Sequence, residues 1–146
     1  MESIRCTKLD PRAKLPSYAS ADAAGMDLYA LTDAPVEIPA GGTALIHTGV
    51  AMAIPGGYGG FLYARSGLAA KQGLAPANKV GVIDADYRGE IMVALHNHSD
   101  TARIVESGDR IAQLVIAPVL RVKLEECENL DDTERGSGGF GSTGRA

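Results

Sequence analysis

The sequence has few cysteines, no long apolar run and no excess of positive charge. Its two cysteines, Cys6 and Cys127, lie far apart and form no C-x-x-C pair, a pattern typical of structural thiols in a reducing cytosol. No apolar run approaches the roughly 18 residues of a membrane span, and the first ten residues contain no apolar signal core. We therefore expect a cytoplasmic protein with no membrane partner.

The charge balance narrows the possible ligands. The formal net charge is −4, which argues against a general nucleic-acid binder, because such proteins must neutralise many phosphates. A small anion could still bind where cationic side chains and backbone N–H groups converge. The length of 146 residues, of which 45% are hydrophobic, suits one folded domain and excludes a disordered chain.

Most of the chain is predicted to form short strands. Segments rich in strand-forming residues cover residues 43–54, 61–63, 91–95, 111–117 and 119–124. Glycine-containing turn signals separate them roughly every ten residues, as in all-β sandwiches and barrels. One short helix is expected over residues 66–72, closed by Gly73 at its C-cap. No internal repeat is visible.

The last segment has a different composition. Residues 129–146 offer little to bury, and five glycines fall between Gly136 and Gly144. Such a segment cannot offset its ordering entropy, so a body of residues 1–128 and a flexible arm of residues 129–146 are expected. The arm is nevertheless suited to an anionic nucleotide, because its glycine N–H groups, hydroxyls and arginine are donors. Phe140 offers a face for stacking a base.

Two further segments contain side chains that could bind a ligand or take part in a reaction. Arg65, Ser66 and Gly67 begin the expected helix, where free N–H groups, a guanidinium and a hydroxyl could bind phosphate. The alternative is an ordinary serine N-cap beside a solvated arginine. Asp84 and Asp86 lie in an expected turn, where carboxylates could bind a metal, act as a base or only form turn hydrogen bonds.

A pair of histidines is a weaker candidate. His96 and His98 are two residues apart and would share one strand face. That spacing can ligate a metal, but the sequence offers no obvious third ligand, so a metal site is not favoured.

Five segments stand out in order along the chain: residues 23–28, residues 65–69, Asn78 with residues 81–89, residues 108–114, and residues 135–144. Together they resemble the five motifs of the trimeric deoxyuridine triphosphatase (dUTPase) family. The resemblance implies an all-β, jelly-roll-like distorted barrel with one short helix. It also implies a homotrimer whose active sites are shared: one chain supplies the first, second and fourth segments, another the third, and the arm of the remaining chain closes over the site.

The same resemblance implies hydrolysis of dUTP to dUMP and pyrophosphate with Mg²⁺ as cofactor. This reaction would limit uracil incorporation into DNA and supply dUMP for thymidylate synthesis. Asp84 resembles the general base that orients a water toward the α-phosphorus. No direct protein ligand for the metal is implied, although Asp27 resembles a residue that meets the metal's water shell. The implied substrate-binding residues are Arg65, Ser66, Gly67, Asn78, Gly81, Val82, Ile83, Tyr87, Met92, Gln113, Arg135, Phe140, Gly141, Ser142 and Thr143.

These residues divide by role. Asn78 and the backbone of residues 82–84 would read uracil, and Tyr87, with Met92 beside it, would exclude a 2′-hydroxyl. Residues 65–67 with Gln113 would cradle the phosphates, and Arg135, Ser142 and Thr143 would bind the γ-phosphate. Asp109 and Arg110 could be structural partners instead. Two rival interpretations are less favoured. A dCTP deaminase of the same fold is disfavoured because Asp84 with Tyr87 matches the hydrolase pattern. A catalytically idle binding module, which the fold alone does not exclude, is disfavoured by the intact Asp84, Arg65 and arm motif.

Overall fold

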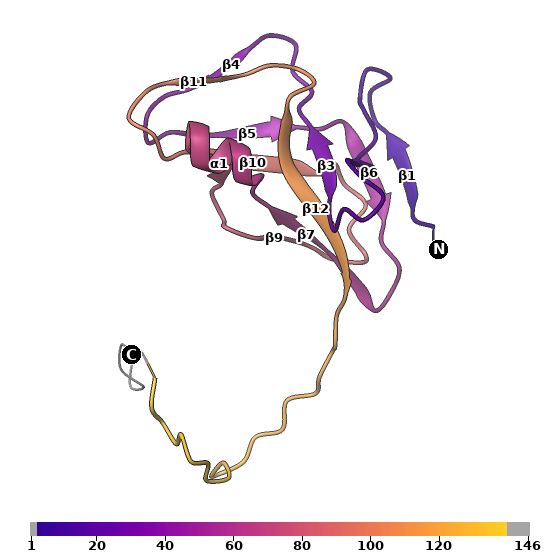
Figure 1. Ribbon diagram of the computed structural model, residues 1–146. Coiled ribbons are helices and arrows are strands. Elements are labelled where there is room, and N and C mark those ends of the chain that lie inside the picture. The colour runs from indigo at the N-terminus through magenta and orange to yellow at the C-terminus, as the bar shows by residue number, and fades with distance from the viewer. Residues whose placement is uncertain (1–2, 140–146) are drawn as a thin grey trace.

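The computed structural model of the chain describes residues 3–139 (Figure 1). Within that range it contains one short helix and twelve strands, so the prediction of an all-β, jelly-roll-like fold is confirmed. In chain order the elements are β1 (Arg5–Lys8), β2 (Ser17–Tyr18), β3 (Met26–Tyr29), β4 (Val36–Ile38), β5 (Thr43–His47), β6 (Val50–Ala53), β7 (Tyr58–Tyr63), α1 (Ser66–Gln72), β8 (Leu74–Pro76), β9 (Gly81–Ile83), β10 (Met92–Asn97), β11 (Arg103–Val105) and β12 (Arg110–Pro118).

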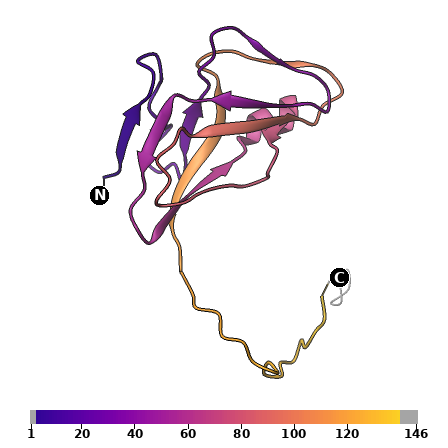
Figure 2. The ribbon, with the colours of Figure 1, turned by 180° about the vertical axis from the view of Figure 1, so that it is seen from behind.

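The strands form four antiparallel groups that wrap around one core. The largest is a five-stranded sheet in the order β2-β3-β12-β7-β9, and a three-stranded sheet has the order β5-β10-β8. Two pairs, β1 with β6 and β4 with β11, complete the barrel. Figure 2 shows the long strand β12 crossing behind the three-stranded sheet. Non-consecutive strands are thus neighbours, which brings distant sequence segments together.

The core is aliphatic. Along β10 buried and half-buried residues alternate, as expected for a strand with one face packed inward. Leu28, Ile46, Leu95 and Leu114, from four different strands, are at most 1% exposed. The one helix within the described range is far too short and polar to cross a membrane.

Two glycines fix local features of the chain. The predicted continuous strand over residues 43–54 is broken at Thr48 and Gly49, and Gly49 has φ 69°. A Cβ on Gly49 would lie 2.5 Å from a methyl carbon of Leu31. A larger residue is therefore disfavoured both by the positive φ and by the lack of space for a side chain. Gly73 caps α1 with φ 69°, as predicted, but Arg65 rather than Ser66 occupies the N-cap, and no side chain caps that end.

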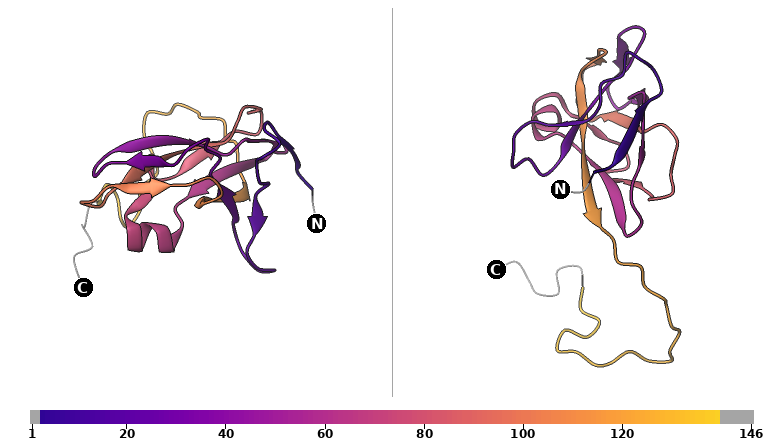
Figure 3. Two further views of the ribbon diagram at one scale, coloured as in Figure 1. Left: turned by 90° about the horizontal axis from the view of Figure 1, so that it is seen from above. Right: turned by 90° about the vertical axis from the view of Figure 1, so that its right-hand side faces the viewer.

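The prediction of a strand over residues 119–124 is wrong. Strand β12 ends at Pro118, and the following residues extend away from the barrel with no regular structure as far as residue 139 (Figure 3). Leu120, Val122 and Leu124 alternate as in a strand, yet each is at least 67% exposed. A strand needs a neighbour for its backbone N–H and C=O groups. Within residues 3–139 the backbone of this segment has one such bond, from the Val119 N–H to the Gly57 carbonyl at 2.8 Å, and no strand pairs with residues 120–124. The division at residue 129 stays a prediction.

Candidate active site

A buried carboxylate organises one end of the barrel. Asp27 on β3 is 2% exposed, and both of its oxygens bind arginines. The Nε of Arg65 donates to Oδ1 at 2.8 Å, and Nη1 of Arg110 donates to Oδ2 at 3.2 Å. A buried carboxylate needs such charge-assisted partners to offset the loss of hydration. One carboxylate shared by two guanidinium groups leaves this cluster with an unbalanced positive charge.

Strand pairing explains why these residues meet. Strand β12 lies between β3 and β7, and Gln113 on β12 is the register partner of both Asp27 and Tyr63. Arg65 comes two residues after the end of β7 and reaches back to β3. The register between β3 and β12 shifts between Arg110 and Ala112, which indicates a β-bulge. Bulges re-aim side chains, and this one lets Arg110 reach the carboxylate beside Gln113.

The two arginines open onto a hollow of about 250 Å³. It lies between α1, β8, β11 and the start of β12. Asp109 is on its rim, where its carboxylate accepts the N–H of Glu106 at 2.8 Å. The residues that line the hollow are Arg65, Leu68, Gln72, Leu74, Ile104, Val105, Asp109, Arg110 and Ile111. A hollow whose lining includes two arginines is suited to an anion.

A second hollow contains Asp84. This residue follows β9 directly and is exposed. The hollow, of about 510 Å³, is a groove between β7, β9 and the first residues beyond β12. Its lining residues are Gly56, Gly57, Tyr58, Gly59, Phe61, Val82, Ile83, Asp84, Ala85, Asp86, Val119 and Arg121. No residue lines both hollows, so one chain does not bring Asp84 into the Arg65 hollow.

Asn78 stands at the entrance to β9. Its Nδ2 lies 3.3 Å from the position that a Cβ on Gly81 would occupy, so the absence of a side chain at Gly81 leaves room for the amide. The turn between them is tight, because the N–H of Val80 donates to the carbonyl of Asn78 at 2.7 Å. Val82 is exposed on β9, the outer strand of the largest sheet.

Tyr87 and Met92 lie farther along the same segment. The N–H of Tyr87 donates to the carbonyl of Asp84 at 3.1 Å, which closes the turn. The Tyr87 hydroxyl donates to the carbonyl of Glu90 at 2.8 Å. Met92 begins β10 opposite His47. Neither Tyr87 nor Met92 lines the Asp84 groove, so their assignment to the nucleoside stays a prediction.

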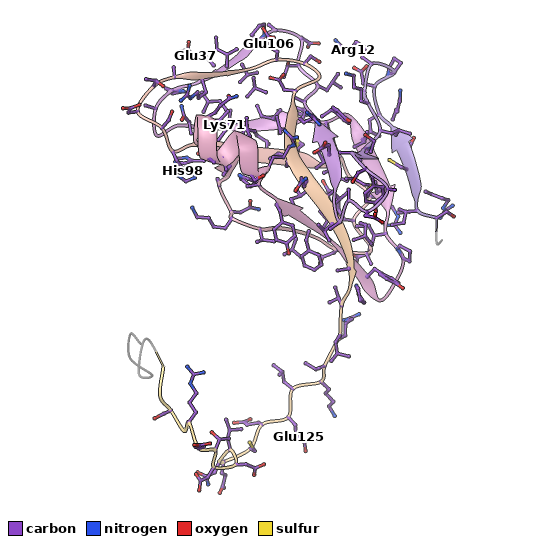
Figure 4. All side chains as sticks on the ribbon, viewed as in Figure 1. Arg12, Glu37, Lys71, His98, Glu106 and Glu125 are labelled. Carbon is purple, nitrogen blue, oxygen red and sulfur yellow. The ribbon has the colours of Figure 1, made fainter. Side chains whose placement is uncertain are left out.

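The extended segment contributes one described candidate. Arg135 is exposed, and its Nε donates to the carbonyl of Gly138 at 3.0 Å. Figure 4 shows the side chains of this segment, Glu125 among them, standing clear of the barrel. The remaining arm candidates, Phe140, Gly141, Ser142 and Thr143, lie outside the described residues.

The described residues offer no ready-made metal cage. Within residues 3–139 no three His, Cys, Asp or Glu side chains are grouped so that they could hold a metal. His96 and His98 do lie together, with ring centroids 4.4 Å apart, and Nδ1 of His96 is hydrogen-bonded to the Thr43 hydroxyl at 2.8 Å. Cys6 and Cys127 are both free thiols, and burial raises the pKa of Cys6.

The position of Arg110 was not predicted from the sequence. The motif indicated only that Arg110 and Asp109 could be structural partners, whereas in the structure Arg110 binds Asp27 on β3. The only usable signal was its position three residues before Gln113. In a regular strand that spacing puts the two side chains on opposite faces, and the bulge that changes this has no sequence signature.

The chain is similar to known proteins over almost its whole length. A family model described as dUTPase matches residues 11–144. A deoxyuridine 5'-triphosphate nucleotidohydrolase of Syntrophotalea carbinolica is 51% identical over 142 residues, 97% of each chain. The enzyme of the same name from Anaplasma marginale is 50% identical over 130 residues, 89% of this chain and 88% of the relative.

Solved structures agree with the sequence comparison. A Staphylococcus bacteriophage 80alpha dUTPase with dUpNHpp superposes with a TM-score of 0.90 at 29% identity, over 99% of this chain and all of the other. The dUTPase from phage phi11 of S. aureus superposes with a TM-score of 0.81 at 25% identity, over 90% of this chain and all of the other.

Proposed function

Because the chain belongs to the dUTPase family, we propose that it hydrolyses dUTP by attack of an Asp84-activated water on the α-phosphorus. The chain is a nucleotide hydrolase that converts dUTP to dUMP. The proposal concerns how it does so. The phosphate-binding part of the proposal is supported by the Asp27 cluster, in which two arginines share one buried carboxylate beside Gln113. The assignment of the base is supported by the exposure of Asp84 in its groove.

In this mechanism the triphosphate binds at the Arg65 hollow. The guanidinium of Arg65 and the side chain of Gln113 hold phosphate oxygens, and Ser66 and Gly67 add donors at the start of α1. Asp27 keeps the Arg65 guanidinium in one orientation, and Arg110 balances the same carboxylate. Preorganised donors of this kind stabilise charge that builds up on phosphate oxygens during the reaction.

Asp84 then acts on a water molecule. Its carboxylate accepts a proton while the water oxygen forms a bond to the α-phosphorus, and the bond from that phosphorus to the bridging oxygen of the β-phosphate breaks. The products are dUMP and pyrophosphate. The exposure of Asp84 on its groove leaves the carboxylate open to a water and to a substrate.

The nucleoside would be read by the segment around β9. Asn78 and the backbone of residues 81–83 offer uracil fixed donors and acceptors that mispair with cytosine. Tyr87, with Met92 beyond it, would form the wall against the sugar that leaves no room for a 2′-hydroxyl. The arm would close the site with Arg135, Ser142 and Thr143 on the γ-phosphate and Phe140 on the base, and Gly141 would let the backbone approach.

The residues present fit a metal that is bound mainly by the substrate's phosphates. Both oxygens of Asp27 already bind arginines, so this carboxylate would meet a metal only through water. When bound, Mg²⁺ supplies neutralisation of the triphosphate charge. The chain's own contribution is to orient the phosphates with Arg65 and Gln113 and to hold the proton at Asp84.

We propose further that the active protein is a homotrimer with shared sites. The separate linings of the Arg65 hollow and the Asp84 groove support this, because a second chain would be needed to unite them. The exposed segment after Pro118 supports the participation of a further chain. Closed cyclic symmetry would then give three equivalent sites. In the cell such an enzyme would limit uracil incorporation into DNA and supply dUMP for thymidylate synthesis.

Hydrolysis in ¹⁸O-labelled water tests the point of attack. We expect the label in dUMP and none in pyrophosphate, which mass spectrometry of the products distinguishes. Label in pyrophosphate would refute attack at the α-phosphorus. Two further outcomes would support the rival interpretations. Release of ammonia from dCTP would indicate a deaminase. Binding of dUTP without formation of product would indicate a catalytically idle module.

A further inference from the structure

Glu90 joins two parts of the chain that are far apart in sequence. Its Oε1 accepts the N–H of Gly49 at 2.8 Å, and its Oε2 lies 2.9 Å from Nδ1 of His47. The side chain is only 22% exposed. Both oxygens of one carboxylate are therefore bound to the link between β5 and β6, and they tether the end of the 84–90 loop to it.

The same residue holds the ring of Tyr87 through its backbone. The Tyr87 hydroxyl donates to the carbonyl of Glu90 at 2.8 Å. The ring also lies against the backbone of Gly89: a Cβ there would be 2.5 Å from the hydroxyl oxygen and 2.7 Å from Cζ. The position of the ring thus depends on where residues 89 and 90 are held.

The carboxylate is a strong acceptor for these contacts. Burial raises the pKa of Glu90, but the hydrogen bonds from His47 and from the Gly49 N–H lower it by more, so its pKa lies below the usual value. Hydrogen bonds to an ionised group are roughly twice as strong as neutral ones. Backbone contacts share in this tether. The Ile91 N–H, which belongs to the same peptide group as the Glu90 carbonyl, donates to the Val50 carbonyl at 2.8 Å, and the Thr48 hydroxyl donates to the Ile91 carbonyl.

We propose that Glu90 is a positioning residue for Tyr87 and, through it, a determinant of the choice between deoxyribose and ribose. Glu90 touches no substrate in this account. Its side chain, together with the backbone bond from Ile91 to Val50, holds the carbonyl that the Tyr87 hydroxyl needs, and Gly89 leaves the ring room to lie there. The second half of the proposal rests on the proposed role of Tyr87 at the sugar, whereas the first half does not.

Three variants distinguish loss of the Glu90 side-chain contacts from loss of its charge and from nonspecific effects of a substitution. Glu90→Ala removes both side-chain contacts, and Glu90→Gln keeps an acceptor for the Gly49 N–H and a polar partner for His47. Glu37→Ala is the matched control, since Glu37 is exposed on β4 (Figure 4) and its side chain forms no hydrogen bond or ion pair with residues 84–90. If Glu90→Ala fails to fold, His47→Ala removes one of the two contacts and takes its place.

The first measurement is the ratio of kcat/KM for UTP to that for dUTP. We expect Glu90→Ala to raise this ratio roughly five- to tenfold, a change within the range of imperfect steric exclusion. Glu90→Gln should restore most of the wild-type ratio, and Glu37→Ala should not change it. In a Tyr87→Ala background, Glu90→Ala should have no further effect on the ratio. An unchanged ratio in Glu90→Ala, when Tyr87→Ala does raise it, would overturn the proposal.

The second measurement needs no catalysis. In protein with ¹³C-labelled tyrosine rings, the Tyr87 signal is identified by its loss in Tyr87→Phe. We expect that signal to shift and broaden in Glu90→Ala, to stay near its original position in Glu90→Gln, and to be unmoved in Glu37→Ala. A Tyr87 signal unchanged in Glu90→Ala would overturn the positioning role. A moved signal with no effect of Tyr87→Ala on the UTP ratio would instead refute only the proposed sugar contact.

Discussion

The Arg65 hollow and the Asp84 groove are built in opposite ways. The first is anchored on the central strands of the largest sheet, with a carboxylate 2% exposed and both of its oxygens bound. The second has its carboxylate exposed on a turn. Among the described residues that line the groove, Arg121 is the one cation, and it belongs to the extended segment beyond β12. The barrel thus holds the charges of the Asp27 cluster in fixed positions and leaves the Asp84 carboxylate exposed.

The difference indicates that the two regions have different functions. Phosphate binding needs charges held in fixed positions, which a folded barrel can provide from one chain. A general base needs access to water and to a substrate, which an exposed turn provides. We propose that Asp84 of one chain acts on a substrate whose phosphates are bound at the Arg65 hollow of another chain. Changes at the two places should therefore have different consequences.

The largest effect is expected at Asp84. Asp84→Asn should lower the hydrolysis rate by ~10²–10⁴, the usual worth of a general base, and leave dUTP binding nearly unchanged. Steady-state kinetics and calorimetric titration measure the two quantities. The matched control is Asp86→Asn in the same turn, which should keep near wild-type turnover. The reverse order of the two variants would assign the base to Asp86.

Removal of the arm should affect catalysis but not the fold. A chain lacking residues 134–146 should turn over dUTP about 10²-fold more slowly, as expected when a closing element no longer fixes the substrate. Its melting temperature should stay close to that of the full chain, because Glu134 to Gly139 bury almost nothing. Calorimetry checks the second point. A large loss of thermal stability would mean that the arm has a structural role.

Asp27 should matter for both stability and binding. Asp27→Asn leaves two guanidinium groups without their shared counter-charge, so the free energy of unfolding should fall by roughly 3 kcal/mol. Urea unfolding at one fixed protein concentration measures this. Asp22→Asn, at an exposed residue in the turn before β3, is the control. Equal stability of the two variants would show that the Asp27 cluster contributes no net stabilisation.

The smallest effect is expected at Tyr87. Tyr87→Ala should raise kcat/KM for UTP relative to dUTP by about tenfold, because removal of an aromatic wall opens space for a hydroxyl. Tyr18→Ala, at a residue exposed on β2, controls for the loss of a tyrosine. If the ratio is the same in both variants, the sugar is recognised elsewhere.

Local patterns predicted much of the fold. The helix and its Gly73 cap, and the strand over residues 111–117, follow from composition and turn chemistry within a few residues, and the structure confirms them. The strand predicted over residues 119–124 was wrong because strand formation depends on a neighbour that the local sequence does not reveal. The break at Thr48 and Gly49 was missed, although a glycine inside a strand pattern can mark an irregularity. The contacts that exclude a side chain at Gly49, with Leu31 and Ala13, are distant in sequence.

The site was predictable only in part for the same reason. Motif resemblance identified Arg65, Gln113 and Asp27, and the structure brings these three together. It could not assign Arg110, whose reach depends on a bulge in β12. Nor could it indicate that Glu90 ties the Tyr87 loop to Gly49, since that contact spans 41 residues of sequence.

Sharing of the site between chains is the central claim, and subunit mixing tests it directly. Equal amounts of an Asp84→Asn chain and a chain lacking residues 134–146 are unfolded together and refolded, and mass spectrometry confirms mixed assemblies. A working site would take Asp84 from a truncated chain and the arm from an Asp84→Asn chain, so about one quarter of sites in randomly assorted trimers should be active. We therefore predict recovery of about one quarter of wild-type activity. Activity no higher than the mean of the two parent proteins, with mixed trimers present, would contradict the shared site.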